Sequence, residues 1–462
     1  MHYLSTRGAT EPHSFGNVLL GGLARDGGLF MPQFWPRIPA EEIASYADAT
    51  YQDVAWRVLE RFVGASFAED DLKADIDAAY ATFDAPDIAP LVEIEPGLHL
   101  LELFHGPTLA FKDIAMQLLG RLFARALAKR GGRATILAAT SGDTGAAAIA
   151  AFGGLPNIDV FVLHPHGRVS EVQRRQMTTA AFANVHNIAL EGSFDDAQAI
   201  VKGLFADRDF AGRTHLTAVN SINFVRIAAQ CVYYFTAAAK LGRPPVFVVP
   251  TGNFGDVFAG EAAMHMGLGI EELVVATNAN DIMARALNDG VYAAGDARPT
   301  LSPSMDIQVA SNFERALFEA SGRDAAWVAQ AMDAFARERR LALPTHILSA
   351  LRARYSAFAI DDAETLATIK RVHVATGRLV DPHTAVGLAA AAKVKGRRTE
   401  PVVVLATAHA AKFPEALVQA TGISCPLPER LRALYENEER ASVLPRDAAA
   451  VRAFIEIRLS RP

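Results

Sequence analysis

Lys112 is the residue of this chain with the clearest potential for covalent chemistry. It follows the run His105-Gly-Pro-Thr-Leu-Ala-Phe111 and stands immediately before an amphipathic helical segment. Burial in apolar surroundings and the positive end of a helix both disfavour an ammonium ion, so they lower the pKa of a lysine placed there. A neutral lysine amine can form a Schiff base with a carbonyl cofactor. A lysine taken alone is more often a solvated surface residue, so this interpretation needs cofactor-binding residues elsewhere in the chain.

Two polar loops follow apolar segments and could meet Lys112. Thr140-Ser-Gly-Asp-Thr-Gly145 comes after residues 134–139, and Pro250-Thr-Gly-Asn-Phe-Gly-Asp256 comes after residues 246–249. Small residues at a helix start present backbone N–H groups to an anion, which suits a substrate carboxylate in the first loop and a phosphate in the second. The second loop lacks the Lys-Ser/Thr ending of ATP-binding loops and the spacing of the dinucleotide fingerprint. Simpler alternatives are an N-cap by a polar side chain of the first loop and a ligand-free turn in the second.

Two further segments carry candidate ligands. Thr407 ends an apolar run at 402–406, and its neutral hydroxyl could hydrogen-bond a ring nitrogen; His409 and Lys412 follow as anion ligands or as ordinary surface residues. Asn220-Ser-Ile-Asn-Phe-Val-Arg226 combines hydroxyl, amide and guanidinium groups at a helix start, a composition suited to a second phosphate. The alternative for that segment is a helix capped by Ser221, with its arginine in solvent.

Short apolar runs alternate with helical segments from Arg133 onward, which predicts an α/β fold with a parallel sheet. Continuous Val, Ile and Leu runs are typical of strands buried on both faces. Ligands of such sheets bind where strand carboxyl ends meet helix N-termini, so the polar loops would lie together. We predict strands at 134–139, 158–163, 185–190, 246–249, 273–276 and 402–406. We predict helices from Lys112 to Gly131, at 144–152 and at 195–206. A further helix should begin at Ser170, with Gln173 completing a capping box.

Composition narrows the class of protein. The chain has 462 residues, 51% of them hydrophobic and 21% charged, which is typical of a globular protein with two or three domains. A net charge of -6 without a basic tract argues against nucleic acid or an anionic membrane as a partner. Cys231 and Cys425 lie in no metal-ligand spacing, and the N-terminus has no apolar signal region. We therefore expect a cytoplasmic protein without a metal.

Taken together, the motifs resemble the threonine synthase family, in its longer class with an extended N-terminal region and an inserted helical segment. The resemblance begins at Tyr3-Leu-Ser-Thr-Arg-Gly8 and continues in order to about residue 415. It implies the fold type II (tryptophan-synthase-β-like) architecture of pyridoxal-phosphate enzymes, with two parallel-sheet α/β domains. The implied reaction converts O-phospho-L-homoserine and water into L-threonine and phosphate, the last step of threonine biosynthesis by a carbon–oxygen lyase. The other matching motifs are His105-Gly-Pro-Thr-x-x-Phe-Lys-Asp113, Thr140–Gly145, Ser221-Ile-Asn-Phe-x-Arg226, Pro250–Asp256 and Thr407-Ala-His-x-x-Lys-Phe413.

The resemblance also implies a role for each motif residue. Lys112 would be the catalytic residue and would hold pyridoxal 5′-phosphate as a Schiff base. Thr407 would face the pyridine nitrogen of the cofactor. Asp143 would lie by the 3′ oxygen, at a position where many fold type II relatives have Asn. The cofactor phosphate would lie on Gly252, Asn253, Phe254, Gly255 and Asp256. The substrate-binding candidates are Thr140, Ser141, Thr144, Ser221, Asn223, Arg226 and Lys412.

The expected domain division follows the same family pattern. Residues 1–95 form an N-terminal helical cap region, and residues 113–235 form the small α/β domain. Residues 96–112 and 236–462 form the large cofactor-binding α/β domain, in which 281–360 is a helical insertion or lid. The chain is expected to be a monomer or a homodimer.

Two other functions fit parts of the sequence. A phospho-lyase or a serine/threonine dehydratase would keep the fold and cofactor, but a dehydratase acting on hydroxy amino acids needs no substrate phosphate site at Arg226. A nucleotide-sensing or scaffolding protein on a doubly wound sheet would not need Lys112 at all.

Overall fold

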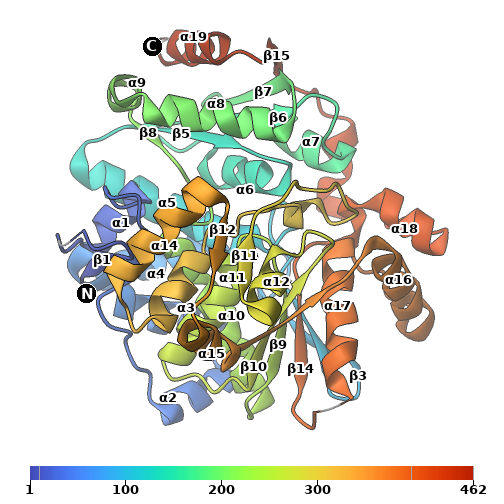
Figure 1. The fold of residues 1–462 in the computed structure, drawn as a ribbon. Coiled ribbons are helices and arrows are strands. Elements are labelled where there is room, and N and C mark those ends of the chain that lie inside the picture. Colours follow the sequence, from blue (N-terminus) through green and yellow to red (C-terminus); the bar gives the residue numbers. More distant parts are fainter. Residues whose placement is uncertain (10, 397, 461–462) are drawn as a thin grey trace.

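The computed structural model describes residues 1–9, 11–396 and 398–460, and it is organised around two main β-sheets (Figure 1). The larger sheet has six strands in the order β13-β10-β9-β14-β4-β3, and the smaller has five in the order β15-β7-β6-β5-β8. All neighbouring pairs in both sheets are parallel except β3 and β4. The predicted α/β fold with two parallel sheets is confirmed.

Both faces of the larger sheet are covered, which explains its continuous apolar strands. Val246 and Val248 of β9 pack in one hydrophobic cluster with residues of α17, whereas Phe247 and Val249 pack in another with residues of α10 and α11. Alternate side chains of a strand point to opposite faces, so each face has its own helical layer. The elements of this part are β3 (Leu91–Glu95), β4 (Leu98–Glu102), β9 (Val246–Pro250), α11 (Gly255–His265), β10 (Glu272–Thr277), α12 (Ile282–Asp289), β11 (Val291–Ala293), η3 (Pro303–Met305), α13 (Phe313–Ala320), α14 (Ala325–Glu338), β12 (Arg340–Ala342), α15 (Thr345–Arg352), β13 (Tyr355–Ala359), α16 (Asp362–Thr376), α17 (Pro382–Lys395), β14 (Val402–Ala406), η4 (Ala410–Lys412) and α18 (Pro414–Thr421).

The smaller sheet lies in the upper part of Figure 1, with α8 and α19 above it and α6 below. The strands and helices that were predicted for this part lie within two residues of their predicted bounds, because apolar strand runs and helix caps are local signals. No bounds were predicted for the other elements of this part. The elements here are α5 (Lys112–Arg130), β5 (Ala134–Ala139), α6 (Asp143–Phe152), β6 (Ile158–Pro165), α7 (Glu171–Thr178), β7 (Val185–Glu191), α8 (Phe194–Ala206), α9 (Arg208–Arg213), β8 (Leu216–Thr217), α10 (Phe224–Leu241), β15 (Ser442–Pro445) and α19 (Ala448–Leu459).

The N-terminal region packs as helices against α10 and α5, in line with its prediction as a cap. Tyr3 shows how firmly it is attached, because its buried hydroxyl donates to the Phe62 carbonyl at 2.9 Å and its ring contacts Phe224 of α10. The elements are β1 (Tyr3–Ser5), α1 (Phe15–Gly21), β2 (Phe30–Pro32), α2 (Ala40–Ser45), α3 (Tyr51–Val63) and α4 (Glu69–Tyr80).

Two strands, β15 and β3, depart from the predicted domain division. Residues 442–459 were assigned to the large domain, but β15 pairs in parallel with β7 and α19 packs on α8, so this segment completes the small sheet. The 281–360 segment contains four α-helices, as its prediction as mainly helical requires, and it also contributes β13 to one edge of the larger sheet. β3, placed in the N-terminal region, forms the other edge through its pairing with β4. Edge strands carry weak sequence signals, because one side of each has no partner strand.

Within the described ranges, none of the helices combines the length and hydrophobicity that a membrane span needs.

Candidate active site

A tight turn places Lys112 at the first position of α5. The backbone N–H and the hydroxyl of Thr108 both donate to the Asp113 carboxylate at 2.7 Å. Gly106 is required by the same turn, because a Cβ at that position would lie 2.4 Å from the Asp113 Cβ. The motif residues before Lys112 therefore build the turn, and the lysine is delivered at the start of a helix as predicted.

Asp143, the first residue of α6, is the centre of the polar network around Lys112. Its Oδ2 lies 3.3 Å from the Lys112 Nζ and accepts a hydrogen bond from the Ser304 hydroxyl at 3.0 Å. Its Oδ1 lies 2.7 Å from the Lys412 Nζ and accepts from the Gln173 side-chain amide at 2.7 Å. Burial raises the pKa of Asp143, but the two lysine charges outweigh burial and hold that pKa well below its usual range. Asp143 is therefore an ionised carboxylate between two lysines.

The environment of Lys112 shifts its pKa toward neutrality. Its side chain is 12% exposed, and burial lowers its pKa. Asp143 raises the pKa again, whereas the positive charges of Lys412 and Arg226 lower it further, and the net pKa is below the ordinary value of lysine. A lowered pKa is what a lysine needs to act as a nucleophile or a proton acceptor near neutrality.

The loop after β14 lies directly beside the Lys112 turn. The Phe111 N–H donates to the Thr407 carbonyl at 2.8 Å, and Ala408 forms a β-bridge with Ala110. Thr407 is 6% exposed, and among the described residues its hydroxyl has no partner. That hydroxyl is therefore free to bond a group held next to Lys112.

The structure gives Lys412 and His409 roles other than direct anion binding. Lys412 is completely buried, and its ammonium donates to the Thr108 carbonyl at 2.7 Å in addition to pairing with Asp143. It is thus a charge partner of Asp143 that also holds the Lys112 turn. His409 accepts the Ala411 N–H at its Nδ1 and so begins the short helix η4, which agrees with the structural alternative for this residue.

The glycine-rich loop after β9 is closely packed against its neighbours. A Cβ on Gly252 would lie 2.9 Å from the Ser304 carbonyl oxygen, and one on Gly255 would lie 3.2 Å from the Asn312 amide nitrogen. Phe254 has a left-handed backbone with φ of 63°, and its buried ring packs between two aromatic rings. The loop therefore leads directly into α11, and the free backbone N–H groups at the N-terminus of this helix point toward the loop. Other proteins bind phosphate with this arrangement.

Asp256 lies behind this loop and faces α10. One carboxyl oxygen accepts from the Tyr233 hydroxyl, with Tyr234 as a second donor at 3.4 Å. The other oxygen is buried and has no partner among the residues that the structure describes. Burial raises the pKa of Asp256 to about 7. A carboxyl with that pKa is protonated in a large fraction of molecules at neutrality, which reduces its repulsion of a nearby phosphate.

Arg226 is a buried cation with unused hydrogen-bonding capacity. It is 3% exposed, its Nη1 donates to the Val219 carbonyl at 3.4 Å, and its Nε has no partner in the part of the chain that the structure describes. Burial lowers its pKa to about 10, so it remains charged at neutrality. The alternative with Arg226 in solvent is wrong. A buried guanidinium that lacks partners requires an acceptor, and an anionic substrate would supply one.

The other residues of the Arg226 segment are engaged in the fold. Asn223, rather than Ser221, is the N-cap of α10, because its Oδ1 accepts the Val225 N–H at 3.1 Å. Its amide donates to the Leu19 carbonyl at 2.9 Å, so the predicted substrate role of Asn223 is replaced by a structural one. The Ser221 carbonyl accepts from the Asn312 amide at 3.2 Å, and this contact ties the segment to the glycine-rich loop.

The loop after β5 is held by Thr140, whose hydroxyl oxygen accepts the N–H groups of Gly142 and Gly145, both at 2.9 Å. Gly142 takes the N-cap position with φ of 144°, so the alternative with a polar side chain as N-cap is wrong. The hydroxyls of Ser141 and Thr144 are half-buried and have no partner within the described ranges. These hydroxyls can serve a substrate carboxylate, whereas Thr140 shapes the loop.

These contacts bring the five predicted segments together. Asp143 touches Lys112, Thr407 binds the residue before Lys112, and Ser304 joins Asp143 to the glycine-rich loop. Asn312 links that loop to the Arg226 segment through carbonyl groups on each. The residues fit a phosphorylated aldehyde cofactor, because a lysine with a lowered pKa faces a loop with a helix N-terminus for phosphate.

Comparisons with known proteins agree with this geometry. Residues 2–80 match the family model "Threonine synthase N terminus", residues 83–350 match "Pyridoxal-phosphate dependent enzyme", and residues 384–455 match "Threonine synthase, C-terminal". The chain is 50% identical to threonine synthase of Pseudomonas aeruginosa over 459 residues, which cover 98% of each chain. The chain belongs to the threonine synthase family.

Solved structures of this family superpose over the whole chain. A crystal structure of PLP-bound threonine synthase from Brucella melitensis has a TM-score of 0.97 with 49% identity, and the match covers 100% of both chains. Threonine synthase from yeast has a TM-score of 0.94 with 35% identity and 99% coverage of both chains. The predicted resemblance and the fold type II architecture are confirmed.

Several residues of the site were not predicted from the sequence. Gln173 was assigned only to a helix start, but its amide reaches across to Asp143. Asn312 and Arg315 hold the carbonyls of the Ser221–Asn223 turn, and Arg315 is completely buried. Ser304 had no sequence signal, because a lone serine in a segment of irregular structure resembles any loop serine.

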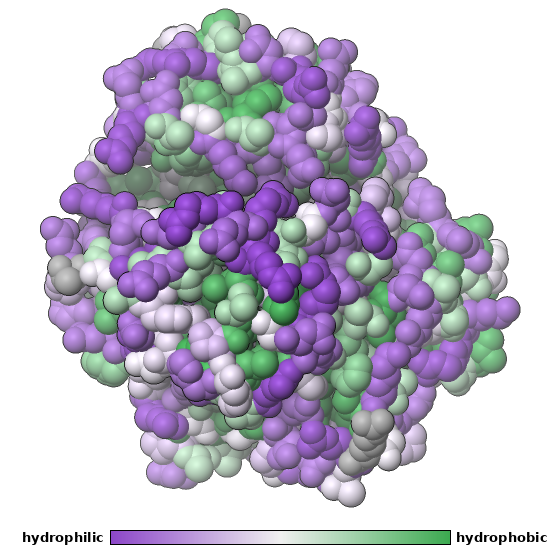
Figure 2. Space-filling view, in the orientation of Figure 1, coloured by the Kyte–Doolittle hydropathy of each residue, from purple (hydrophilic) through white to green (hydrophobic). Residues whose placement is uncertain are grey.

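The space-filling view shows a hollow between the part that contains the smaller sheet and the body below it (Figure 2).

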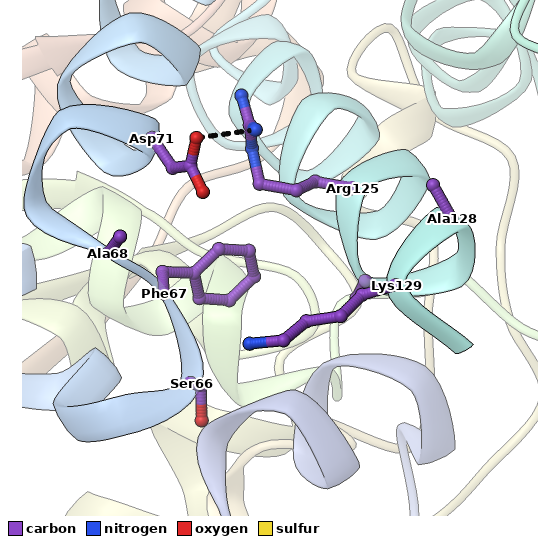
Figure 3. Close-up of a pocket in the computed structure, with 8 residues that line it drawn as sticks. Ser66, Phe67, Ala68, Asp71, Arg125, Ala128 and Lys129 are labelled. Carbon is purple, nitrogen blue, oxygen red and sulfur yellow. Dashed lines mark hydrogen bonds and ion pairs between the residues drawn. The ribbon is translucent and has the colours of Figure 1, made fainter.

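A separate cavity of about 440 Å³ lies between α4 and α5 (Figure 3). In that cavity Arg125 pairs with Asp71 at 2.8 Å, and the Lys129 side chain extends beneath the Phe67 ring. Arg125 is thirteen residues beyond Lys112 on one helix, roughly 20 Å away at 1.5 Å per residue, so this cavity is no part of the site.

Proposed function

We propose that this protein converts O-phospho-L-homoserine and water into L-threonine and phosphate, with pyridoxal 5′-phosphate bound to Lys112. One observation carries the proposal beyond family membership. Lys112 has a lowered pKa and lies near two distinct candidate anion positions, the glycine-rich loop and the guanidinium of Arg226, whose Nε has no partner among the described residues. A cofactor phosphate and a substrate phosphate require two such positions.

The cofactor would be held by residues already in place. Gly252 to Asp256 and the N-terminus of α11 would bind its phosphate, Thr407 would hydrogen-bond the pyridine nitrogen, and ionised Asp143 would face the 3′ oxygen. When bound, the cofactor supplies an electron sink for the carbanion that forms after loss of the substrate Cα proton.

The chain itself supplies proton transfer and charge stabilisation. Lys112, as a neutral amine, would take the substrate Cα proton and then a Cβ proton, and it would return protons to Cγ and Cα after the phosphate has left. Arg226 stabilises the phosphate as it leaves Cγ, and the hydroxyls of Ser141 and Thr144 orient the substrate carboxylate. Water would then add its oxygen at Cβ, and the proton that it loses would go to the released phosphate.

A dehydratase is the second candidate, because it uses the same fold and cofactor. The buried Arg226 argues against it, since a dehydratase substrate has no phosphate to satisfy that guanidinium. A non-enzymatic sensor or scaffold has no use for a buried lysine paired with a buried carboxylate. The cytoplasmic location and the choice between monomer and homodimer stay predictions.

The test supplies the cofactor-loaded protein with O-phospho-L-homoserine, L-serine or L-threonine in parallel. Phosphate and threonine in equal amounts from the first substrate, with little keto acid from the other two, would support the proposal. 2-Oxobutyrate and phosphate without threonine would instead indicate a phospho-lyase, and keto acid from serine or threonine alone would indicate a dehydratase.

A further inference from the structure

We propose that Ser304 and His383 are positioning residues that set the charge environment of Lys112 through Asp143. Ser304 lies at the tip of the 300–306 loop, which includes η3, and His383 lies in the first turn of α17. The inference deepens the proposed function and rests on it for its catalytic consequences.

Ser304 contacts three separate parts of the molecule. Its hydroxyl donates to Asp143 Oδ2 in the small-sheet part at 3.0 Å. Its carbonyl oxygen lies over Gly252, where a Cβ would approach it to 2.9 Å. Its backbone N–H donates to His383 Nε2 at 3.2 Å. One residue therefore joins the loop after β5, the glycine-rich loop and α17.

His383 is held in a single orientation by Asp381. The two residues are 3% and 1% exposed, and His383 Nδ1 lies 2.8 Å from Asp381 Oδ1. Nε2 accepts the Ser304 N–H, so it carries the lone pair and Nδ1 carries the proton that is donated to Asp381. The imidazole is therefore neutral, and it can hold Ser304 only in this tautomer.

The rest of the 300–306 loop is fixed at the end of β10. The Asn278 amide donates to Asp306 Oδ1 and to the Thr300 hydroxyl, both at 2.8 Å. The Asp306 Oδ2 in turn accepts the Thr300 N–H at 3.0 Å. The loop is thus restrained on both sides of its tip, and the Ser304 hydroxyl is held toward Asp143. A merely mobile surface loop would not need this buried network.

The consequence for chemistry follows from which oxygen Ser304 binds. Asp143 Oδ2 is also the oxygen that faces Lys112, so the Ser304 hydrogen bond partly neutralises the charge that would otherwise stabilise a protonated Lys112 nitrogen. Lys412 faces the other oxygen of Asp143, and the positive Arg226 and the carboxyl of Asp256 also lie near enough to act on Lys112. Removing the Ser304 hydroxyl should favour the proton on that nitrogen.

The experiment uses the cofactor-loaded protein and its visible absorbance, which changes when the Lys112 nitrogen in the Schiff base loses its proton. We expect Ser304→Ala to raise the pH of the absorbance midpoint by about one unit, the scale of a hydrogen bond to a charged group. We expect kcat for O-phospho-L-homoserine to fall about tenfold with little change in KM. Ser304→Thr, which retains a hydroxyl, should restore both values, and the matched control Ser349→Ala alters an exposed serine of α15.

The His383 variants test the second half of the proposal. His383→Ala should shift the midpoint in the same direction as Ser304→Ala. His383→Gln retains an acceptor for the Ser304 N–H, so its absorbance midpoint should lie close to that of the wild type. If His383→Ala fails to fold, the two Ser304 variants and His383→Gln still decide the question.

A midpoint for Ser304→Ala equal to that of Ser349→Ala would overturn the proposal. A shift in Ser304→Ala with none in a folded His383→Ala would overturn the role of His383. The absorbance titration needs no substrate, so failure of wild-type protein to form threonine would refute the proposed function without affecting this test.

Discussion

Replacing Lys412 by methionine should destabilise the protein more than replacing Lys412 and Asp143 together. The Lys412 Nζ lies 2.7 Å from Asp143 Oδ1, and the two side chains are 0% and 4% exposed. At an effective dielectric constant of about 20, this attraction is about 6 kcal/mol, and that of Lys112 at 3.3 Å is about 5 kcal/mol. Lys412→Met therefore removes about half of the attraction and leaves a buried carboxylate with one cation.

Losing one partner of a buried ion pair costs about 3–5 kcal/mol in comparable proteins. We expect a loss of that size for Lys412→Met, and a smaller loss for Lys412→Met combined with Asp143→Asn, because the buried carboxylate is then removed and Lys112, whose pKa burial lowers, can lose its proton. The coupling energy of the double-mutant cycle should be about 1–3 kcal/mol. The assay is guanidinium chloride denaturation of the cofactor-free protein. The free energy of the first unfolding transition is compared between the variants and the wild type, because a protein of this size need not unfold in one step.

The pH dependence has a defined sign. The folded-state pKa of Asp143 is lowered, so its stabilising contribution is present above the unfolded pKa and is lost as the pH falls through the folded pKa. Lys412→Met raises the folded pKa, so the acid-side loss of stability should begin at a higher pH than in the wild type. Strictly additive effects of the two substitutions, or an unchanged acid limb, would refute the reasoning.

Three further substitutions test other parts of the site. Arg226→Met should lower kcat/KM for O-phospho-L-homoserine by about 10²–10³-fold. The control Arg213→Met, which removes a half-exposed guanidinium, should change kcat/KM little. Equal kcat/KM values for the two variants would contradict the role of Arg226 in binding the substrate phosphate. Gly252→Ala should weaken cofactor binding in a fluorescence titration, because its Cβ would meet the Ser304 carbonyl at 2.9 Å. Gly203→Ala should bind normally, because a Cβ there would meet no atom of the described residues within 4 Å. The pKa of Asp256 is raised to about 7, so its ionisation destabilises the folded state as the pH rises from about 4 to about 7. Asp256→Asn should therefore gain stability relative to the wild type from about pH 5 to about pH 8. A difference in denaturation midpoint that stays constant over this range would contradict the prediction.

The sequence predicted most of the fold because its signals are local. β5 and β14 span the predicted residues, and the helix from Lys112 ends at Gly131 in the left-handed conformation expected of a helix-ending glycine. The pairing of β15 with β7 was missed, because it joins segments about 250 residues apart and leaves no periodic signal in either.

The candidate site was predicted less completely than the fold. Motif residues marked where the loops lie, but not which side chains face the centre of the site and which hold the backbone. Asn223 and Lys412 illustrate the second group, because a helix cap and a buried ion pair use the same residue types as a ligand site. Ser304 illustrates the opposite failure, since it reaches Asp143 only through the folding of a segment about 160 residues away.

The most direct test of the account is to compare wild-type protein and Lys112→Ala, both incubated with pyridoxal 5′-phosphate and O-phospho-L-homoserine. The account predicts equal amounts of threonine and phosphate from the wild type, and neither product from a Lys112→Ala variant whose circular dichroism shows it to be folded. Borohydride reduction should fix the cofactor to the peptide that contains Lys112 in the wild type alone. Threonine formation by the folded variant, or cofactor fixed to another lysine of the wild type, would contradict the central role of Lys112.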